Sequence, residues 1–142
     1  MKITVLGAGS SAGTPVIGCE CPVCRSSNMK NKRSRCSSII TLDNGSHILI
    51  DTSPDFKMQA MREQIHKIDA VLFTHHHADH CHGIDDLRAY CQKYKQAIPI
   101  FANENTIKEL KLKFNYAIRE ESQFWETPVL QANIVNGPFR IE

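Results

Sequence analysis

A histidine-rich run of seven residues constrains this chain more than any other feature of its sequence. Residues 74–80 read Thr-His-His-His-Ala-Asp-His, and the pattern H-x-H-x-D-H is formed by His75, His77, Asp79 and His80. The hydrophobic-leaning residues 70–74 come directly before it and are typical of a buried strand. Imidazole nitrogens and a carboxylate oxygen suit Zn, Fe or Mn. The sequence therefore predicts a metal centre at the end of a strand, where a bound ion usually activates water.

The alternative for this run is a histidine-rich tract on the protein surface. Two features of its surroundings favour the metal site. Asp79 interrupts the histidines, and a predicted strand leads into the run while Gly83 opens a predicted helix after it. His76 and His82 lie off the pattern, so we expect them to be exposed or to orient the ligands rather than to bind metal.

The size and charge of the chain indicate one ordinary globular domain. Its 142 residues can bury a core, and 42% of them are hydrophobic and 23% charged. The net charge of +2 gives no strong nucleic-acid signal. The basic residues within 30–35 are interpreted as a solvated loop, with a phosphate-binding patch as the alternative. No apolar run reaches the roughly 18 residues of a membrane span, and residues 1–9 lack the apolar core of a signal peptide.

Three of the six cysteines form a second cluster of possible ligands. Cys19, Cys21 and Cys24 have the spacing C-x-C-x-x-C, which is too tight for a typical disulfide framework. Without a secretion signal, metal binding is favoured over unligated thiols or a redox pair, and we expect a cytoplasmic location. Structural zinc sites are tetrahedral and rich in thiolates, so these residues predict a structural Zn.

The other three cysteines leave alternatives open. Cys91 falls on the apolar face of a predicted helix and is expected in the core. Cys81 directly follows the histidine run and is expected near the metals, and Cys36 is a possible substitute zinc ligand.

The order of predicted elements indicates a layered α/β fold with a mixed sheet. Asn44-Gly45 predicts a two-residue hairpin turn between two of the strands. In the helix that Pro54 opens, Phe56, Met58, Met61 and Ile65 are the expected apolar positions. We expect strands at 2–6, 37–42, 47–51, 68–74, 98–102, 129–135 and from 139 onward, and helices at 54–66, 84–94 and 105–114. Phe124 and Trp125 are expected in the core or an interface.

The glycines of residues 7–13 superficially resemble a dinucleotide-binding turn. Such a turn needs a helix to start there, with its N-terminus on the pyrophosphate. Pro15, Gly18 and Pro22 exclude a long helix at this place. The glycines are therefore interpreted as a tight loop near the site.

Taken together, these segments resemble the metallo-β-lactamase superfamily. Residues 74–80 after a strand are similar to its metal-binding signature, and Leu49-Ile50-Asp51-Thr52-Ser53 is similar to its early motif, a strand ending in Asp. Residues 7–15, 17–24 and 35–39 narrow the resemblance to the branch of phosphoribosyl 1,2-cyclic phosphate phosphodiesterases. The resemblance implies an αββα sandwich, of which residues 1–142 form a single incomplete domain. This is its first half, with the zinc-binding segment 19–36 inserted near the start.

The resemblance also implies roles for the two clusters. His75 and His77 would bind one active-site metal, and Asp79 and His80 a second, both Zn or Mn. Metal-activated hydroxide would then hydrolyse a cyclic phosphate or another small phosphodiester substrate. Cys19, Cys21 and Cys24 would hold a structural Zn with a distant histidine. Asp51 would support the metal loop by hydrogen bonds; the alternative is a helix cap, for which Ser53 is better placed.

The chain departs from the superfamily pattern because no histidine follows His82. The remaining ligands are expected beyond residue 142 or on a second polypeptide. Two alternatives to the phosphodiesterase therefore stay open: a non-catalytic zinc-binding fragment or interaction module, and another superfamily hydrolase such as a nuclease or thioesterase. Half a sandwich also predicts an uncovered sheet face, and with it a homo-oligomer or a need for the missing carboxy-terminal half. The residues expected on that face are Ile39, Ile48, Ile50, Val71 and Phe73.

Overall fold

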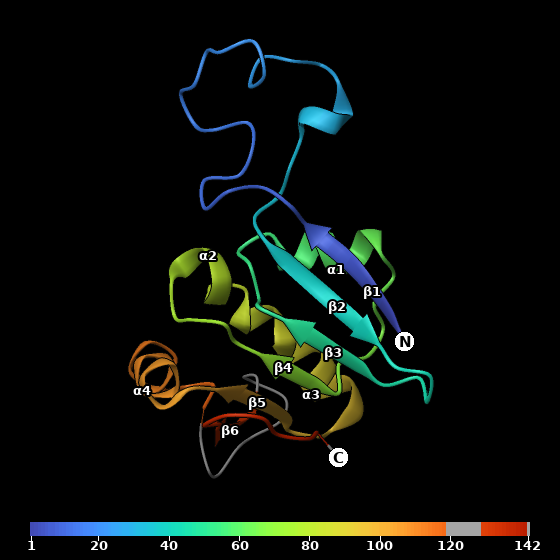
Figure 1. Ribbon diagram of the computed structural model, residues 1–142, viewed down its shortest axis with the longest axis vertical. Helices are drawn as coiled ribbons and strands as arrows, with labels where there is room; N and C mark the ends of the chain where they lie inside the picture. Colours follow the sequence, from blue (N-terminus) through green and yellow to red (C-terminus); the bar gives the residue numbers. More distant parts are fainter. Residues whose placement is uncertain (119–128, 142) are drawn as a thin grey trace.

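The computed structural model describes residues 1–118 and 129–141, and it contains one six-stranded mixed sheet (Figure 1). The strands follow one another in sequence order across the sheet. They are β1 (Lys2–Gly7), β2 (Ser37–Thr41), β3 (His47–Ile50), β4 (Ala70–Leu72), β5 (Ile98–Ala102) and β6 (Leu130–Ile134). The pairs β1–β2 and β2–β3 are antiparallel. The pairs β3–β4, β4–β5 and β5–β6 are parallel. The predicted α/β class with a mixed sheet is confirmed.

The α-helices lie in the connections between the parallel strands, as crossover connections require. They are α1 (Phe56–Arg62), α2 (Ala78–Cys81), α3 (Arg88–Tyr94) and α4 (Glu104–Lys113). Of the two 3-10 turns, η1 (Met29–Asn31) lies between β1 and β2, and η2 (Ile84–Leu87) directly precedes α3. The predicted helix over 84–94 is thus divided into η2 and α3. Phe124 and Trp125 lie outside the described residues. Within the described part of the chain, no helix is long and apolar enough to cross a membrane.

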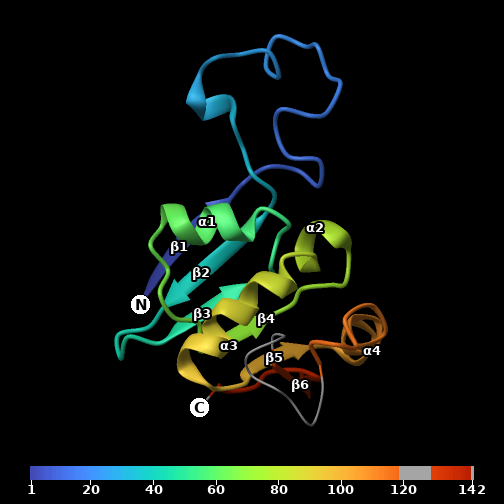
Figure 2. The same ribbon diagram turned by 180° about the vertical axis from the view of Figure 1, so that it is seen from behind.

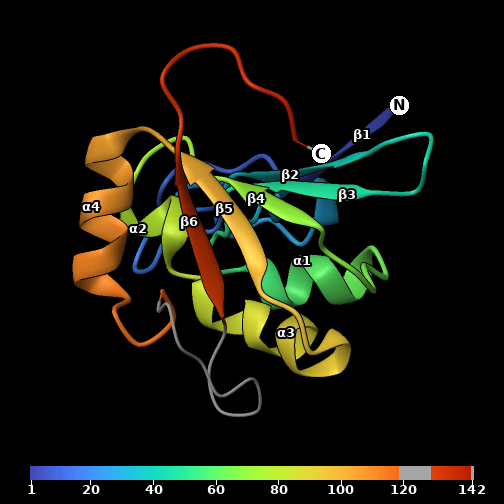
Figure 3. The ribbon, with the colours of Figure 1, turned by 90° about the horizontal axis from the view of Figure 1, so that it is seen from below.

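Helices α1 and α3 cover one face of the sheet (Figures 2 and 3). The residues beneath them form a row through the pairing register, in which Ile39 lies beside Leu49, Leu49 beside Val71, and Val71 beside Ile100. All four are at most 3% exposed and belong to one core cluster with Phe56 of α1. Fully burying a side chain of this size stabilises the fold by roughly 1.5–3 kcal/mol.

The opposite face of the sheet is also apolar, but no described helix packs on it. Successive residues of a strand point to opposite faces, so Ile3 and Val5 lie on this side and are 59% and 60% exposed. Figure 3 shows the segment after β6 rising over this face. From that segment, the ring of Phe139 stacks on Phe101 with 5.4 Å between centroids. We call this surface the open face.

One face of the sheet is uncovered, as expected, but three of the five residues that we assigned to that face lie on the other one. Ile48 and Ile50 lie on the open side, although Ile48 is itself 8% exposed. Ile39, Val71 and Phe73 instead face the helices and are at most 4% exposed. A shift of one residue along a strand moves a side chain to the other face, and both faces here are apolar. Hydrophobicity alone therefore could not assign the faces.

The connection between β2 and β3 differs from the predicted two-residue turn. The N–H of Gly45 donates to the carbonyl of Leu42, and the N–H of Leu42 donates to the carbonyl of Ser46, both at 2.9 Å. Of Asn44 and Gly45, Gly45 alone has a positive φ, at 85°. The connection is therefore a three-residue loop that ends in a left-handed glycine, because the two-residue turn would need a positive φ at both positions.

Two further predictions of local structure were wrong. Met58 and Met61 of α1 are 69% and 66% exposed, and Gln59 is buried instead. The side-chain amide of Gln59 donates to the carbonyl of Arg35 at 2.8 Å, so its burial is satisfied by a distant segment. The strand predicted from residue 139 does not form within residues 139–141.

Residues 8–36 leave the sheet between β1 and β2 and project away from the helices, at the top of Figure 1. We call this segment the cysteine arm. Isolated bridges join Gly9 to Arg35 and Thr14 to Arg33 at its base. The Arg35 guanidinium binds the Asp55 carboxylate at 2.6 and 2.9 Å, and this pairing lowers the pKa of Asp55. The ion pair therefore fastens the base of the arm to the start of α1.

The open face predicts self-association of the 142-residue chain. Exposed apolar patches of more than several hundred Å² commonly mediate association. Val5→Lys should raise the dissociation constant at least about tenfold, equivalent to ~1.4 kcal/mol, because association would bury the ammonium. Sedimentation velocity over a concentration series measures this. Met58→Lys, on the outer surface of α1, is the matched control and should leave association unchanged. A monodisperse parent monomer would contradict the prediction.

Candidate metal centres

The histidine run lies where two parallel strands end. β3 ends at Ile50 and β4 at Leu72, and the run leads from β4 into α2. His77 is the N-cap residue of this short helix. Its backbone carbonyl accepts the N–H groups of His80 and Cys81 at 3.0 and 3.1 Å, while its side chain makes no capping bond. Ligand sites in α/β folds commonly lie beyond the carboxyl ends of parallel strands.

The structure places the four predicted ligands beside one another on this loop and helix, although they do not form a group of three ligand atoms within 4.8 Å of one another. The His75 ring lies 4.0 Å from the His80 ring and 4.7 Å from the His77 ring, measured between centroids. Nε2 of His80 lies 3.2 Å from a carboxylate oxygen of Asp79. Partial burial, together with His80 and His77, lowers the pKa of His75. That shift favours neutral imidazole, the form that binds metal.

A buried aspartate holds this loop from the neighbouring strand. Asp51 follows β3, is 2% exposed and has a φ of 58°. One carboxylate oxygen accepts the backbone N–H of Thr74 at 2.8 Å. The other accepts the Thr74 hydroxyl and pairs with Nδ1 of His80, both at 2.7 Å. A left-handed backbone costs a non-glycine residue about 1–2 kcal/mol, and these three bonds offset that cost. The N-cap of α1 is Asp55, whose side chain makes no capping bond, and the Ser53 hydroxyl accepts the Asp55 N–H at 3.2 Å in the turn before the helix.

The same network selects the tautomers of two histidines. The Thr74 hydroxyl donates to Asp51, so its oxygen accepts from Nδ1 of His75 at 3.0 Å. His80 likewise donates from Nδ1 to Asp51. In the neutral form, each of these rings therefore carries its lone pair on Nε2, the atom that can bind a metal. With this tautomer, Nε2 of His80 and the nearby Asp79 oxygen are two acceptors that face each other, and a cation would stabilise that arrangement. The donor set thus fits a divalent metal such as Zn or Mn.

Backbone contacts lock α2 against the segment after Asp51. The N–H of Thr52 donates to the carbonyl of His80 at 2.8 Å, and the N–H of Gly83 donates to the carbonyl of Thr52 at 2.9 Å. A Cβ on Gly83 would lie 2.2 Å from the carbonyl oxygen of Ser53, closer than any real contact. Glycine is therefore required there for close backbone approach. This constraint was missed, because Gly83 alone indicated only the start of a helix.

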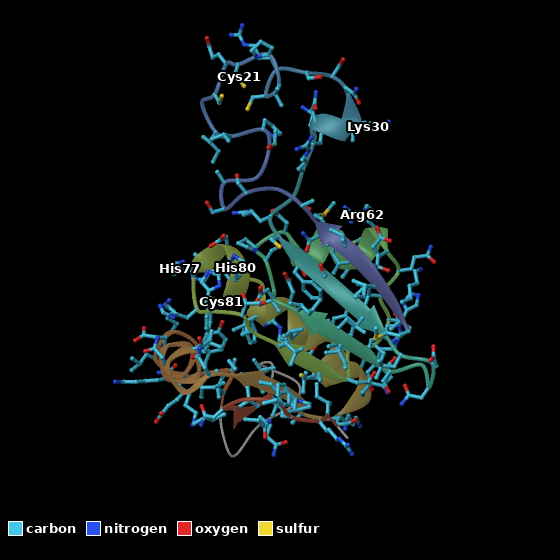
Figure 4. All side chains as sticks on the ribbon, in the orientation of Figure 1. Cys21, Lys30, Arg62, His77, His80 and Cys81 are labelled. Carbon is cyan, nitrogen blue, oxygen red and sulfur yellow. The ribbon has the colours of Figure 1, made fainter. Side chains whose placement is uncertain are left out.

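The three predicted zinc ligands form a separate cluster on the cysteine arm. Among the residues that the structure describes, Cys19, Cys21 and Cys24 are the one group of three possible ligand atoms that lie within 4.8 Å of one another. The backbone N–H of Cys24 and the side chain of Cys19 lower the pKa of Cys21 to about 7. These thiols fit a tetrahedral zinc site. Figure 4 shows Cys21 on the arm, well apart from His77 and His80.

The remaining cysteines take no part in either cluster as thiolate ligands. The buried Cys81 donates its S–H to the carbonyl of His76 at 3.2 Å, and burial raises its pKa to about 11. It therefore stays a protonated thiol near neutral pH. Cys91 is buried in the core, as predicted. Cys36 is exposed and does not belong to the cluster of three thiols.

Sequence comparisons match this chain to parts of longer proteins. The family model described as "Beta-lactamase superfamily domain" matches residues 46–142. The chain is 41% identical over 131 residues to an octanoyltransferase of Porphyromonas gingivalis, and the match covers 92% of this chain and 26% of that protein. It is 27% identical over 141 residues to coenzyme PQQ synthesis protein B of Rhodopseudomonas palustris, covering 91% and 44%. The chain therefore spans less than half the length of these curated relatives.

Solved structures agree with this match. A diphosphatase of the PhnP family is 42% identical and superposes with a TM-score of 0.82 over 94% of this chain and 50% of that one. The Zn(2+)-bound PqqB of Methylobacterium extorquens is 21% identical, with a TM-score of 0.75 over 98% and 48%, and shows the same fold.

Asp51→Asn tests the support of the metal loop. An amide has one acceptor oxygen and one donor nitrogen. Its nitrogen would therefore face a donor of Thr74 or His80, and at least one of the bonds that Asp51 accepts would be lost. We expect a loss of about 1–3 kcal/mol in unfolding free energy and roughly 10–100-fold weaker metal binding at the loop. Denaturant unfolding and metal titration measure these quantities. Asp85→Asn, at a partly exposed pair with Arg88, is the control. Equal effects of the two variants would contradict the assignment.

The lowered pKa of Cys21 predicts its chemical reactivity. The thiolate is the reactive form, so a pKa of about 7 means that Cys21 alkylates at lower pH than an ordinary thiol. In the metal-free chain, iodoacetamide labelling followed by peptide mass spectrometry should give a midpoint near pH 7 at Cys21, and zinc should suppress the labelling. Cys36, exposed on the same arm, is the comparison and should keep labelling when zinc is present.

Proposed function

Because this chain belongs to the beta-lactamase superfamily, in the branch of the PhnP-family diphosphatase, we propose that it carries the first half of a phosphodiesterase site. The family consists of metal-dependent hydrolases. The substrate that we propose is a cyclic phosphate or another small phosphodiester. The observation that supports this most directly is the network in which Asp51 engages Nδ1 of His80 directly and Nδ1 of His75 through Thr74, which leaves Nε2 of each neutral ring as the atom that can bind metal.

In this proposal, His75 and His77 hold one divalent metal, and Asp79 and His80 hold a second. Bound metals supply Lewis-acid polarisation of a phosphoryl oxygen and a water of lowered pKa. The protein's own contribution is to keep the ligands in place. Asp51 holds the His80 ring directly and the His75 ring through the Thr74 hydroxyl, and Gly83 lets α2 approach the backbone of residues 52–53.

The cysteine cluster has a different part in the proposal. Cys19, Cys21 and Cys24 hold a structural zinc that gives the arm a fixed shape, since the arm contains no strand and only the short turn η1. Free, closely spaced thiols of this kind suit a reducing compartment, so we include a cytoplasmic location in the proposal.

The relatives limit what can be transferred to this chain. The diphosphatase supports a substrate with a phosphoryl group, because this chain is 42% identical to it over 94% of the residues of this chain. The octanoyltransferase shares only a quarter of its length with this chain, so its name does not bear on this segment's chemistry. We propose that groups beyond these four ligands, from a carboxy-terminal half or a second copy, complete the site.

A second candidate function is a non-catalytic zinc-binding module or interaction module. The observation that favours it is that the three thiols lie within 4.8 Å of one another, whereas the four loop ligands form no such group. Other hydrolytic activities of the superfamily, of the nuclease or thioesterase type, are alternatives within the leading proposal. Metal counting together with an activity assay separates the candidates.

His77→Ala tests the phosphodiesterase proposal. Elemental analysis of the parent chain should give two or three metals, and the chain should hydrolyse bis-p-nitrophenyl phosphate. His77→Ala should lose a metal and lower the rate by about 100-fold or more, while the structural zinc remains. His66→Ala, at an exposed histidine outside the loop, is the control and should change neither quantity. One zinc per chain with no hydrolysis would favour the non-catalytic module instead.

A further inference from the structure

The C-terminal end of α4 contacts the metal loop at two places, through adjacent residues. Nζ of Lys113 donates to the carbonyl oxygen of His76 at 2.8 Å. The ring of Phe114 meets the ring of His82 edge to face, with 5.7 Å between centroids and 84° between planes. These contacts bracket residues 76–82, which include α2. The ribbon shows α4 beside α2 from more than one side (Figures 1 and 3).

The His76 carbonyl is a sensitive point of the loop. It belongs to the peptide that joins His76 to His77, and His77 is one of the proposed ligands of the first metal. It accepts a second donor from within the loop, the S–H of Cys81 at 3.2 Å. Two donors on one carbonyl fix the orientation of that peptide plane. Rotation of the plane would swing the His77 ring, because the Cα atoms of His76 and His77 flank it.

The core of the domain holds α4 in place. Asn103 caps its first turn by accepting the N–H of Thr106 at 2.8 Å. Ile107 and Leu110 are at most 2% exposed and pack in the core cluster. Lys113 lies in the last turn, where the helix dipole favours a cation. The two contacts therefore connect the metal loop to a rigid element that follows β5.

We propose that Lys113 and Phe114 are positioning residues of the metal site, which set the geometry of residues 76–82 from outside the ligand set. The inference rests on the proposed function only in taking His77 as a ligand. Lys113 orients the peptide that leads into His77, and Phe114 holds the far end of the segment at His82. Neither residue binds metal.

Cobalt titration of the whole chain tests the inference, because the two clusters give different signals. Cobalt bound to the cysteine arm shows thiolate charge-transfer absorption, whereas cobalt on the imidazole and carboxylate ligands shows only weak visible bands. Lys113→Met should weaken cobalt binding at the loop about tenfold, as loss of an outer partner does, and leave the arm unchanged. Lys113→Arg should restore most of the affinity, because it keeps a donor. Phe114→Leu should weaken the loop site in the same sense.

Lys111→Met is the matched control, because Lys111 is exposed in the same helical turn and does not contact the loop. If Lys111→Met and Lys113→Met weaken loop binding equally, the inference fails. It also fails if Lys113→Met weakens both clusters together, because that result indicates general destabilisation.

Hydrogen exchange of the metal-free chain separates this inference from the proposed function. Lys113→Met should speed amide exchange over residues 76–82 several-fold, with no change in β2 and β3. If the parent chain binds no metal at the loop, the proposed function fails and the exchange measurement still decides the positioning role. Unchanged exchange over residues 76–82 would overturn the inference whatever the metal content.

Discussion

The arrangement of the metal loop depends on one buried carboxylate. Asp51 brings together three donors from two residues that are 23 and 29 positions away in the sequence. A buried carboxylate is costly unless its oxygens accept hydrogen bonds, and here the partners are the loop backbone, a loop hydroxyl and a loop imidazole. The bonds therefore satisfy the carboxylate and orient the loop at once. The left-handed backbone of Asp51 shows that the chain accepts local strain to place this group.

The open face and the incomplete ligand set can be understood together. The sheet is apolar on both faces, yet α1 and α3 cover only one of them. The loop ligands follow the carboxyl end of β4, which lies beside the carboxyl end of β3 in the sheet. A second layer on this face would bury Ile3 and Val5 and could bring further side chains to the same strand ends. The diphosphatase, of which this chain spans half, is long enough to contain such a layer.

Local patterns in the sequence predicted the six strands of the sheet and the α/β class, because each depends on residues close together in the chain. The role of the two clusters as metal ligands stays a prediction. What failed depends on packing between distant segments. Hydrophobic residues occupy both faces of the strands, so Ile39 and Val71 could not be assigned to the covered face from sequence. Met58 and Met61 suggested the wrong buried face of α1. The side chain of Gln59 is buried instead, because its amide donates to Ser34 and Arg35, more than 20 residues away in the sequence. The contact between Lys113 and His76 spans 37 positions and has no local signal.

The two clusters differ in how they depend on the fold. The thiols of the cysteine arm lie within six residues, and a backbone N–H of the cluster itself donates to Cys21, so this site is organised locally. The histidine loop takes its shape from Asp51, from the backbone of Thr52 and Gly83, and from α4. Arg35 joins the base of the arm to the rest of the domain. Its guanidinium binds Asp55, and this hydrogen bond is the main reason that the pKa of Arg35 is raised. The arm is therefore fastened to the start of α1, whereas its thiols are brought together by their own short stretch of chain.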